Sequence, residues 1–361
     1  MWNMSELLIA FFISLITALI VTPLVSRLAF KLDVVDRPDG KRKNHNGVKP
    51  SMGGLAIFIG TIAGYLYLQP IDPHLNYIII GACIIILTGM LDDIYNIKPI
   101  YKLIGQLSAA FAVIASGLVI EKLTLPFMGT VHLGEFGIII TLLWIVGASN
   151  AINFLDGLDG LASGVSTIAL SSILVMGLMD YRLIVVYLSI ILIGGTLGFL
   201  VHNFHPAKIF MGDTGALFLG YSIAIVSMLG LFKNVAFFSF LVPFIVIAIP
   251  IFDTTLAIIR RMLNKKGIAT ADKEHIHYQL MNMGYTHRQT VLIIYGFSLF
   301  FGGMAIIFNS ATLLTSLVIF GVIILGIQLI AEMAGVTSQN KQPLLQGIRK
   351  VIGQNRMNRM K

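Results

Sequence analysis

The stretch GLASGVSTIALSSILVMGLMDYRLIVVYLSIILIGGTLGFLV at residues 160–201 decides the fold class. It contains two apolar runs, 160–179 and 183–201, which are separated by a polar turn with Asp180 and Arg182. A helix of about 20 apolar residues spans the roughly 30 Å hydrocarbon core of a bilayer. Two such runs joined by a short turn predict a pair of neighbouring transmembrane helices.

The rest of the 361-residue chain repeats this pattern. Hydrophobic residues make up 57% of it and charged residues only 12%, whereas a soluble domain carries about 25% charged residues. So little charge cannot cover a water-exposed surface, which excludes a soluble globular protein, and a disordered chain needs the opposite composition. The sequence predicts an all-α polytopic integral membrane protein with about 11 (10–11) transmembrane helices. The predicted spans lie at about 5–30, 53–70, 77–92, 102–120, 136–154, 160–179, 183–201, 213–232, 235–260, 290–308 and 311–333.

Lysine and arginine are divided unequally between the two sets of loops that such helices connect. Of the 25 lysines and arginines, only Lys122, Arg182 and Lys233 fall on one side. The positive-inside rule makes the basic side cytoplasmic, so we expect the N-terminus outside and the C-terminus inside. The segment 121–135 then predicts a small extracytoplasmic hairpin. Because the basic charge is spread through short juxtamembrane loops, it does not indicate nucleic-acid binding.

We expect a single transmembrane catalytic domain over residues 1–335, in the plasma membrane, followed by a basic cytoplasmic tail at 336–361. The predicted cytoplasmic loops of the domain are 31–52, 93–101, 202–212 and 261–289. No internal repeat indicates the inverted halves of a secondary transporter.

Acidic residues at membrane-helix ends are rare enough to be functional candidates. Six are predicted at, or within about a turn of, cytoplasmic helix ends: Asp92, Asp93, Asp156, Asp159, Asp213 and Asp253. They face loops rich in lysine, arginine and histidine. This combination indicates a site for a metal ion together with a phosphorylated ligand.

The motif NAINFLDGLDG at 150–160 is the most specific of these signals. Two amides and two carboxylates recur in it at every third residue: Asn150, Asn153, Asp156 and Asp159. Each step of three residues falls about 60° short of a full helical turn, so adjacent members are neighbours but the first and last would lie on opposite sides of the helix. Gly157 and Gly160 are expected to end the helix, which would let the carboxylate of Asp159 turn back toward the others. Such oxygens suit Mg²⁺ more than Ca²⁺. The alternative is a helix C-terminus that is stopped by Asp-Gly turns.

The motif LDD at 91–93 offers two adjacent carboxylates. Neighbouring residues on a helix point about 100° apart, so Asp92 and Asp93 cannot both face one atom. One of them could bind a metal or act as a base while the other contacts a neighbour. The alternative is a solvated helix end.

The motif FMGDTG at 210–215 places Asp213 between two glycines just before a predicted helix. Asp213 could be an ordinary helix N-cap. Gly212 and Gly215 would also let the backbone approach a phosphate, and a helix N-terminus favours an anion. Phe210 offers a flat face for a base, or is an interfacial aromatic residue.

Two basic loops complete the set. The loop 261–289 contains His275 and His277, which share a face only if that stretch is extended. Zinc would need further nitrogen or sulfur ligands at finger-like spacing, and no cysteine is near, so phosphate contact fits better. The first loop carries the same chemistry in RPDGKRKNHNGVKPSMGG, where we expect Arg42 and His45 to bind substrate. The alternative is a pair of solvated basic loops.

In this order, the motifs PSMGG, LDD, NAINFLDGLDG, FMGDTG and DKEHIHYQL resemble the polyprenyl-phosphate N-acetylhexosamine-1-phosphate transferase family, within glycosyltransferase family 4. The resemblance runs from about residue 20 to 300. Within this family, the chain is similar to the branch that attaches GlcNAc-1-phosphate to undecaprenyl phosphate. The branch that transfers phospho-MurNAc-pentapeptide has three successive histidines where this chain has His275-Ile276-His277-Tyr278.

The resemblance implies roles for individual residues. Asp92 matches the base proposed for the lipid phosphate, and Asn153 and Asp213 match Mg²⁺-binding positions, for which Mn²⁺ is an alternative. Phe210 matches an aromatic residue that stacks on uracil, and Lys102 a lysine near the phosphates. The predicted catalytic residues are Asp92, Asp93, Asp156 and His275. The predicted substrate-binding residues are Lys102, Asn150, Asp159, Phe210, His277, Arg42 and His45, and the predicted metal ligands are Asn153 and Asp213.

Further matches concern the nucleotide pocket. Asp156 and Asp159 match acids of that pocket, and His275 and His277 match histidines that approach the pyrophosphate. Tyr278 departs from the HIHH form of this branch.

The implied function is transfer of GlcNAc-1-phosphate from UDP-GlcNAc to undecaprenyl phosphate, at the cytoplasmic face. The product would begin a cell-wall or surface glycopolymer such as teichoic acid. Phospho-MurNAc-pentapeptide transfer is the alternative within the family, and a homodimer stays open. An ion-coupled transporter would need its carboxylates near the bilayer midplane, whereas these cluster at one face.

Overall fold

The computed structural model describes residues 3–37, 47–125, 129–230, 241–263 and 275–333. The helices in this part of the chain are α1 (Met4–Lys31), α2 (Gly54–Leu68), α3 (Leu75–Tyr95), α4 (Pro99–Ala115), α5 (Phe136–Leu155), α6 (Leu161–Met179), α7 (Leu183–Asn203), α8 (Gly212–Gly230), α9 (Leu241–Val246), α10 (Ala248–Leu263), α11 (Ile276–Asn282), α12 (His287–Asn309) and α13 (Leu313–Met333). The strands are β1 (Val35–Asp36), β2 (Lys49–Pro50), β3 (Lys122–Leu125) and β4 (Gly129–His132).

Eight helices among the described residues are long and apolar enough to cross a membrane, namely α1, α3, α5, α6, α7, α8, α12 and α13. The helices α2 and α4 and the segment Ala248–Ile258 of α10 are apolar but shorter. These findings confirm the predicted all-α polytopic membrane fold. The number of spans and the side on which each loop lies stay predictions.

The predicted span at 235–260 differs from the structure. Residues 231–240 lie outside the described residues, and the remainder forms two helices, α9 and α10, with a turn at Ile247 between them. The reason is Pro250, which has no N–H to donate to the carbonyl of Val246 four residues earlier. The helical hydrogen-bond pattern therefore breaks where α9 ends.

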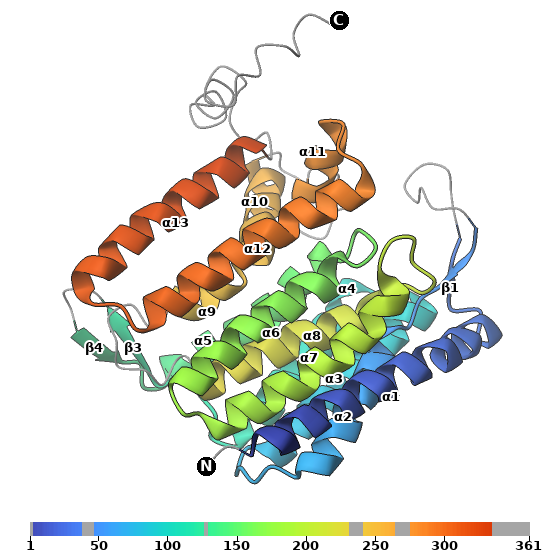
Figure 1. Cartoon of the computed structure of the whole chain (residues 1–361), viewed down its shortest axis with the longest axis horizontal. Helices are drawn as coiled ribbons and strands as arrows, with labels where there is room; N and C mark the ends of the chain where they lie inside the picture. Colours follow the sequence, from blue (N-terminus) through green and yellow to red (C-terminus); the bar gives the residue numbers. More distant parts are fainter. Residues whose placement is uncertain (1–2, 38–46, 126–128, 231–240, 264–274, 334–361) are drawn as a thin grey trace, which may run out of the picture.

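The helix α8 lies at the centre of the bundle, where it packs against α3, α5, α2, α6 and α7 (Figure 1). In its apolar window 89% of the residues are buried, against 28% in α1 and 22% in α13, so α8 is a core helix and the other two face outward. Gly89 of α3 lets the backbones meet, because a Cβ there would lie 2.4 Å from Cα of Thr214. The start of α8 is thus held directly against the last turns of α3.

The two ends of the bundle differ in character (Figure 1). At one end, β3 and β4 pair antiparallel, with Lys122 opposite His132, which confirms the predicted hairpin at 121–135. The helix α1 begins at this end, whereas α13 finishes at the other, beside α11 (Figure 1). The first described helix therefore starts at one end of the bundle, and the last described helix stops at the other.

Candidate active site

Four of the predicted site residues come from the C-terminal ends of α3 and α5 and from the first turns of α4 and α8. Lys102 on α4 contacts Asp92 on α3, Asn153 on α5 and Asp213 on α8. The helix ends that carry them lie at the end of the bundle opposite the β3–β4 hairpin (Figure 1). Residues up to 121 positions apart in the chain thus form one polar cluster, which we call the lysine cluster: Asp92, Lys102, Asn153 and Asp213.

The ammonium of Lys102 is surrounded by oxygen atoms. It donates to Asp213, to Oδ1 of Asn153 at 3.1 Å and to Oδ2 of Asp92 at 3.3 Å. The Asn153 amide in turn donates to Oδ1 of Asp213 at 2.7 Å. The side chains of Lys102 and Asp92 are only 16% and 13% exposed, and such partial burial strengthens the attraction relative to that in water.

The lysine cluster is also the place where a hard cation fits. Amide and carboxylate oxygens are ligands that Mg²⁺ prefers, and Mg²⁺ is usually held by one or two carboxylates. Here the Lys102 ammonium stands in for such a cation, because oxygens of Asn153 and Asp213 already converge on one positive charge. The donor set therefore suits the predicted Mg²⁺ ligands Asn153 and Asp213.

Asp93 faces away from Lys102, toward the start of α8. Its Oδ1 accepts from the backbone N–H of Asp213 at 2.8 Å, and its Oδ2 accepts from the N–H and the hydroxyl of Thr214 at 3.1 and 2.6 Å. Asp93 thus caps α8 from another helix, which leaves the carboxylate of Asp213 free to face Lys102. In this structure Asp93 positions Asp213, whereas Asp213 does not cap its own helix.

The segment before α8 is fixed by the PSMGG motif. The N–H of Phe210 donates to the carbonyl of Pro50 at 2.8 Å, and the N–H of Gly53 donates to the carbonyl of Phe210 at 3.0 Å. The N–H of Gly54 donates to the carbonyl of Met211 at 2.9 Å. These backbone bonds explain why two motifs about 160 residues apart belong to one site, and they hold the partly buried Phe210 beside it.

The structure separates Asn150 from the lysine cluster. Its amide forms a reciprocal pair with the buried Gln106, with N···O distances of 3.0 and 3.3 Å. Gln106 was not predicted, although a glutamine one turn after Lys102 in an apolar helix is a visible signal. Asn150 thus ties α5 to α4, and in this way it supports the helix that carries Lys102.

Asp156 follows α5 directly and is partly buried. Burial raises the pKa of its carboxyl to about 8, with further contributions from the negative charges of Asp213, Asp93 and Asp159. No side-chain hydrogen bond to Asp156 occurs within the described residues. A protonated carboxyl group can donate a hydrogen bond, which suits contact with a phosphate oxygen.

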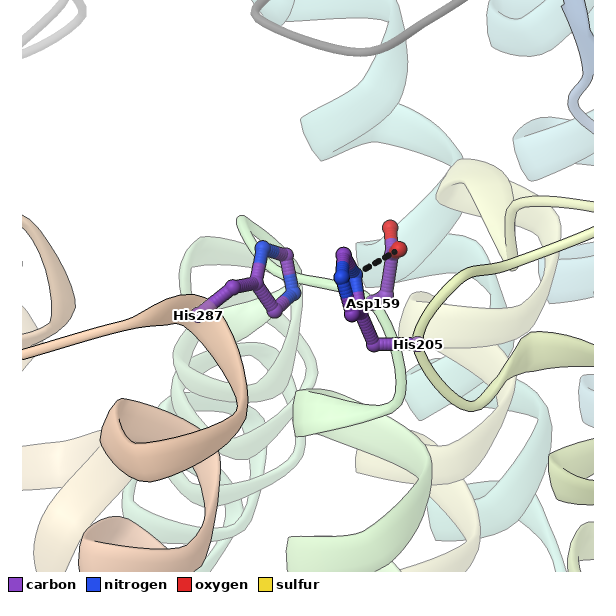
Figure 2. Close-up of side chains that lie close together, drawn as sticks. All are labelled: Asp159, His205 and His287. Carbon is purple, nitrogen blue, oxygen red and sulfur yellow. Dashed lines mark hydrogen bonds and ion pairs between the residues drawn. The ribbon is translucent and has the colours of Figure 1, made fainter.

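Asp159 turns toward the segment between α7 and α8. Its Oδ2 accepts from Nδ1 of His205 at 2.8 Å and from the N–H of Ala207 at 3.0 Å. Figure 2 shows His287, from the first turn of α12, on the other side of His205. Neither histidine was predicted as a site residue.

His275 and His277 lie together at the start of α11, near the turn after α5. Their rings are parallel within 5° with centroids 5.8 Å apart, because His275 is extended while Ile276 begins the helix. Burial lowers the pKa of His277 to about 4, so its ring is neutral near pH 7. Both its ring nitrogens are buried without a hydrogen bond among the described residues.

The neighbours of these histidines explain their placement. A Cβ on Gly157 would lie 2.4 Å from Nε2 of His277, so the glycine leaves room for that ring. Tyr278 packs beside His277 with ring centroids 4.2 Å apart. The buried Asp253 accepts from Nδ1 of His275 at 2.8 Å. The predicted substrate ligands Arg42 and His45 lie outside the described residues.

A bundle of apolar helices with a buried polar cluster at one end is the arrangement of a multi-pass membrane protein with a polar site. Residues 75–231 match the family model described as glycosyl transferase family 4. The chain is 47% identical, over 98% of its length and 99% of the relative, to a probable undecaprenyl-phosphate N-acetylglucosaminyl 1-phosphate transferase of Bacillus subtilis (strain 168). This chain belongs to glycosyl transferase family 4 and is a membrane transferase.

Two further relatives are more distant. A decaprenyl-phosphate N-acetylglucosaminephosphotransferase of Mycobacterium leprae (strain TN) is 33% identical over 87% of this chain and 86% of the relative. An undecaprenyl-phosphate alpha-N-acetylglucosaminyl 1-phosphate transferase of Yersinia pestis is 29% identical over 74% of this chain and 75% of the relative. These relatives are named for polyprenyl-phosphate acceptors and for GlcNAc phosphate transfer.

Proposed function

We propose that this protein transfers GlcNAc-1-phosphate from UDP-GlcNAc to undecaprenyl phosphate. A phosphate oxygen of the lipid attacks the phosphorus that carries the sugar, the bond to UMP breaks, and GlcNAc-pyrophosphoryl-undecaprenol stays in the membrane. The single observation that carries the proposal is the lysine cluster at the end of a membrane-spanning bundle. The names of the relatives, which agree on acceptor class and transferred group, support it.

Both reactants are anionic, so the first obstacle is their mutual repulsion. Lys102 offers a mostly buried ammonium that offsets negative charge on the phosphates, as preorganised cations do for phosphoryl groups. Asn153 and Asp213 would hold Mg²⁺, which when bound takes up charge that develops on the departing UMP. Asp92 orients Lys102 through their ion pair, and it is the candidate acceptor for a proton from the lipid phosphate.

Proton removal is a small part of this reaction. A phosphate monoester has its second pKa at about 6, so the lipid phosphate is largely ionised near neutral pH. We therefore assign Asp92 mainly to positioning. The neutral imidazole of His277 and the Asp253-bound His275 lie at the turn after α5, where they would contact the pyrophosphate.

The proposed site faces the cytoplasm, because the loops at this end carry most of the lysine and arginine. The N-terminus is then outside and the C-terminus inside the plasma membrane. Reporter fusions after Lys361 and within 122–135 test this assignment. Opposite sidedness of the two fusions is expected, and a shared side would contradict it.

The product is proposed to begin a cell-wall or surface glycopolymer such as teichoic acid. The decisive assay uses the purified protein with undecaprenyl phosphate, Mg²⁺ and either UDP-GlcNAc or UDP-MurNAc-pentapeptide, and measures release of UMP. We expect release with UDP-GlcNAc alone, because the last loop of this chain lacks the three successive histidines of the pentapeptide branch. Turnover of the pentapeptide donor alone would reverse the assignment.

A further inference from the structure

Three side chains from separate segments lie close together (Figure 2). Asp159 lies in the turn between α5 and α6, His205 in the segment between α7 and α8, and His287 at the first residue of α12. One ligand atom from each lies within 4.8 Å of the other two. We call these three residues the histidine cluster.

His287 presents an unused ligand atom to this cluster. Its Nε2 is buried and has no hydrogen bond among the described residues. A neutral imidazole has one donor and one acceptor nitrogen, so Nε2 of His287 can offer its lone pair to a cation when the proton is on Nδ1.

His205 lies directly against Asp159. Its Nδ1 is 2.8 Å from Oδ2 of Asp159, and an ionised carboxylate can only accept, so this nitrogen carries the proton in the absence of a cation. A cation bound between these two atoms would replace that proton, and the neutral ring would then carry its proton on Nε2. Asp159 and Nδ1 of His205 can therefore bind the same ion.

The neighbouring bonds fix the backbone of all three segments. The N–H of Ala207 donates to Oδ2 of Asp159 at 3.0 Å, and the Arg288 guanidinium donates to the carbonyl of His205 at 3.1 Å. The rings of His205 and His287 stack with centroids 4.2 Å apart. The ligand atoms are thus carried by a preformed frame, and only side-chain rotations are needed to bring them together.

We propose that Asp159, His205 and His287 form a binding site for one divalent cation of the zinc class. Two imidazoles and a carboxylate suit Zn²⁺, which bonds such atoms at about 2.0–2.2 Å in a tetrahedron. Ligand atoms on such a tetrahedron are about 3.5 Å apart, and the three ligand atoms here lie within 4.8 Å of one another. The lysine cluster, which offers only oxygens, suits Mg²⁺ instead.

The bound ion would join the α5–α6 turn, the α7–α8 segment and the start of α12. The first two of these segments also carry Asp156, a predicted catalytic residue, and Phe210, a predicted substrate-binding residue. The proposal goes beyond the proposed function, because the ion would act as a cross-link between segments and not in the transfer step.

The test measures Zn²⁺ binding to the purified full-length protein in detergent by calorimetry, with millimolar Mg²⁺ present to occupy the oxygen site. The variants are His287→Gln and His205→Gln, and the matched control is His132→Gln, an exposed histidine on β4 at the other end of the bundle. Asp213→Asn serves as the control for the lysine cluster. We expect one equivalent of Zn²⁺ on the wild type and on both controls.

Each cluster variant should weaken Zn²⁺ binding by more than about tenfold, since even loss of an outer partner has that effect. Zn²⁺ should raise the thermal midpoint of the wild type and of the controls, but not of the two cluster variants. Co²⁺ used alone should give the visible absorption of a tetrahedral site in the wild type. Testing two histidines separately keeps the result readable if one variant fails to fold.

The proposal is overturned by absence of saturable Zn²⁺ binding to the wild type. It is equally overturned if both cluster variants, folded by their helical circular dichroism, bind Zn²⁺ as tightly as His132→Gln. Loss of binding in Asp213→Asn but not in His287→Gln would place the ion in the lysine cluster and also contradict the proposal. None of these outcomes depends on UMP release, so they are independent of the proposed function.

Discussion

Asp253 holds His275 through a buried hydrogen bond of 2.8 Å between Oδ2 and Nδ1. The other carboxylate oxygen of Asp253 accepts from the N–H of Ile276 at 2.9 Å. Asp253 is only 1% exposed and His275 only 6%. Because a carboxylate accepts and cannot donate, Nδ1 of His275 carries the proton. Asp253 therefore fixes the tautomer of His275 and leaves Nε2 as the acceptor.

Asp253→Asn should lower turnover at least about tenfold, because an amide NH₂ facing Nδ1 favours the wrong tautomer. We expect the loss in kcat more than in KM. In combination with His275→Gln, the Asp253→Asn change should cost little more, since both act through one ring. A fall in thermal midpoint with unchanged kcat per folded molecule would show that Asp253 only stabilises the fold.

Lys102→Gln should bind Mg²⁺ more tightly than the wild type while losing activity. The ammonium of Lys102 contacts the same oxygens of Asn153 and Asp213 that are proposed to hold Mg²⁺. Its positive charge repels Mg²⁺, so its removal should strengthen Mg²⁺ binding. Calorimetric titration with Mg²⁺ checks the affinity, and UMP release checks the activity. Lys49→Gln, whose lysine donates to the carbonyl of Ala207, is the matched control. Weaker Mg²⁺ binding in Lys102→Gln would contradict the idea that the lysine stands in for the cation.

Asp213→Asn and Asp92→Asn separate cation binding from proton transfer, since both keep shape and remove one charge. Asp213→Asn should need much more Mg²⁺ for half-maximal rate and regain part of its activity when Mg²⁺ is raised. In Asp92→Asn, extra Mg²⁺ should restore nothing, and the loss of a true base would be about 10²–10⁴-fold. Rescue of Asp92→Asn alone would mean that the two roles are exchanged.

Asp156→Asn should make the protein less sensitive to alkaline pH. The pKa of Asp156 is raised from 3.8 to about 8 in the folded protein, so between these values the folded state holds a proton that the unfolded chain has released. Stability from this group is therefore lost as pH rises toward the folded pKa. Without Mg²⁺, the thermal midpoint of Asp156→Asn should exceed that of the wild type, and the gap should widen from about pH 6.5 to 8.5.

His277 does not disturb this measurement, because its pKa is lowered to about 4 and its ring stays neutral throughout that window. Glu121→Gln, an exposed acid beside the β3–β4 hairpin, is the control and should follow the wild type. A constant gap between Asp156→Asn and the wild type at all pH values would contradict the raised pKa.

The sequence was a good guide to where helices lie, because an apolar run of membrane-spanning length allows few other structures. The run predicted at 77–92 is α3, Leu75–Tyr95, and the one predicted at 183–201 is α7, Leu183–Asn203. The break between α9 and α10 was missed, although Pro250 marks it. Hydrophobicity alone does not reveal a missing backbone N–H.

The gathering of acids at one end was also predictable, since helix ends on one side of a membrane meet. Their individual partners were not. Whether Asp93 faces α8 or Lys102 depends on the rotation of α3 about its axis, which packing at Gly89 against Thr214 decides. In the same way, the three-residue repeat grouped Asn150 with Asn153, whereas the structure pairs Asn150 with Gln106.

The histidine cluster was missed because its histidines are 82 residues apart and each looks like a loop residue. One signal was visible for His287. The residues Thr286 and Gln289 form a capping box, and the Thr-x-x-Gln pattern before an apolar run predicts a helix start there. That would have placed His287 at the first residue of a helix.

The cap that Asp93 provides for α8 has a consequence for biosynthesis. The N–H of Asp213 reaches Asp93 across 120 residues of chain, and ribosomes add about 5–20 residues per second. The end of α3 is therefore made roughly 6–24 s before its partner exists. During that delay the carboxylate of Asp93 lacks the N–H groups of α8 that it accepts from in the finished protein. A nascent chain that stalls before α8 therefore differs from a finished one by an acidic side chain without these partners.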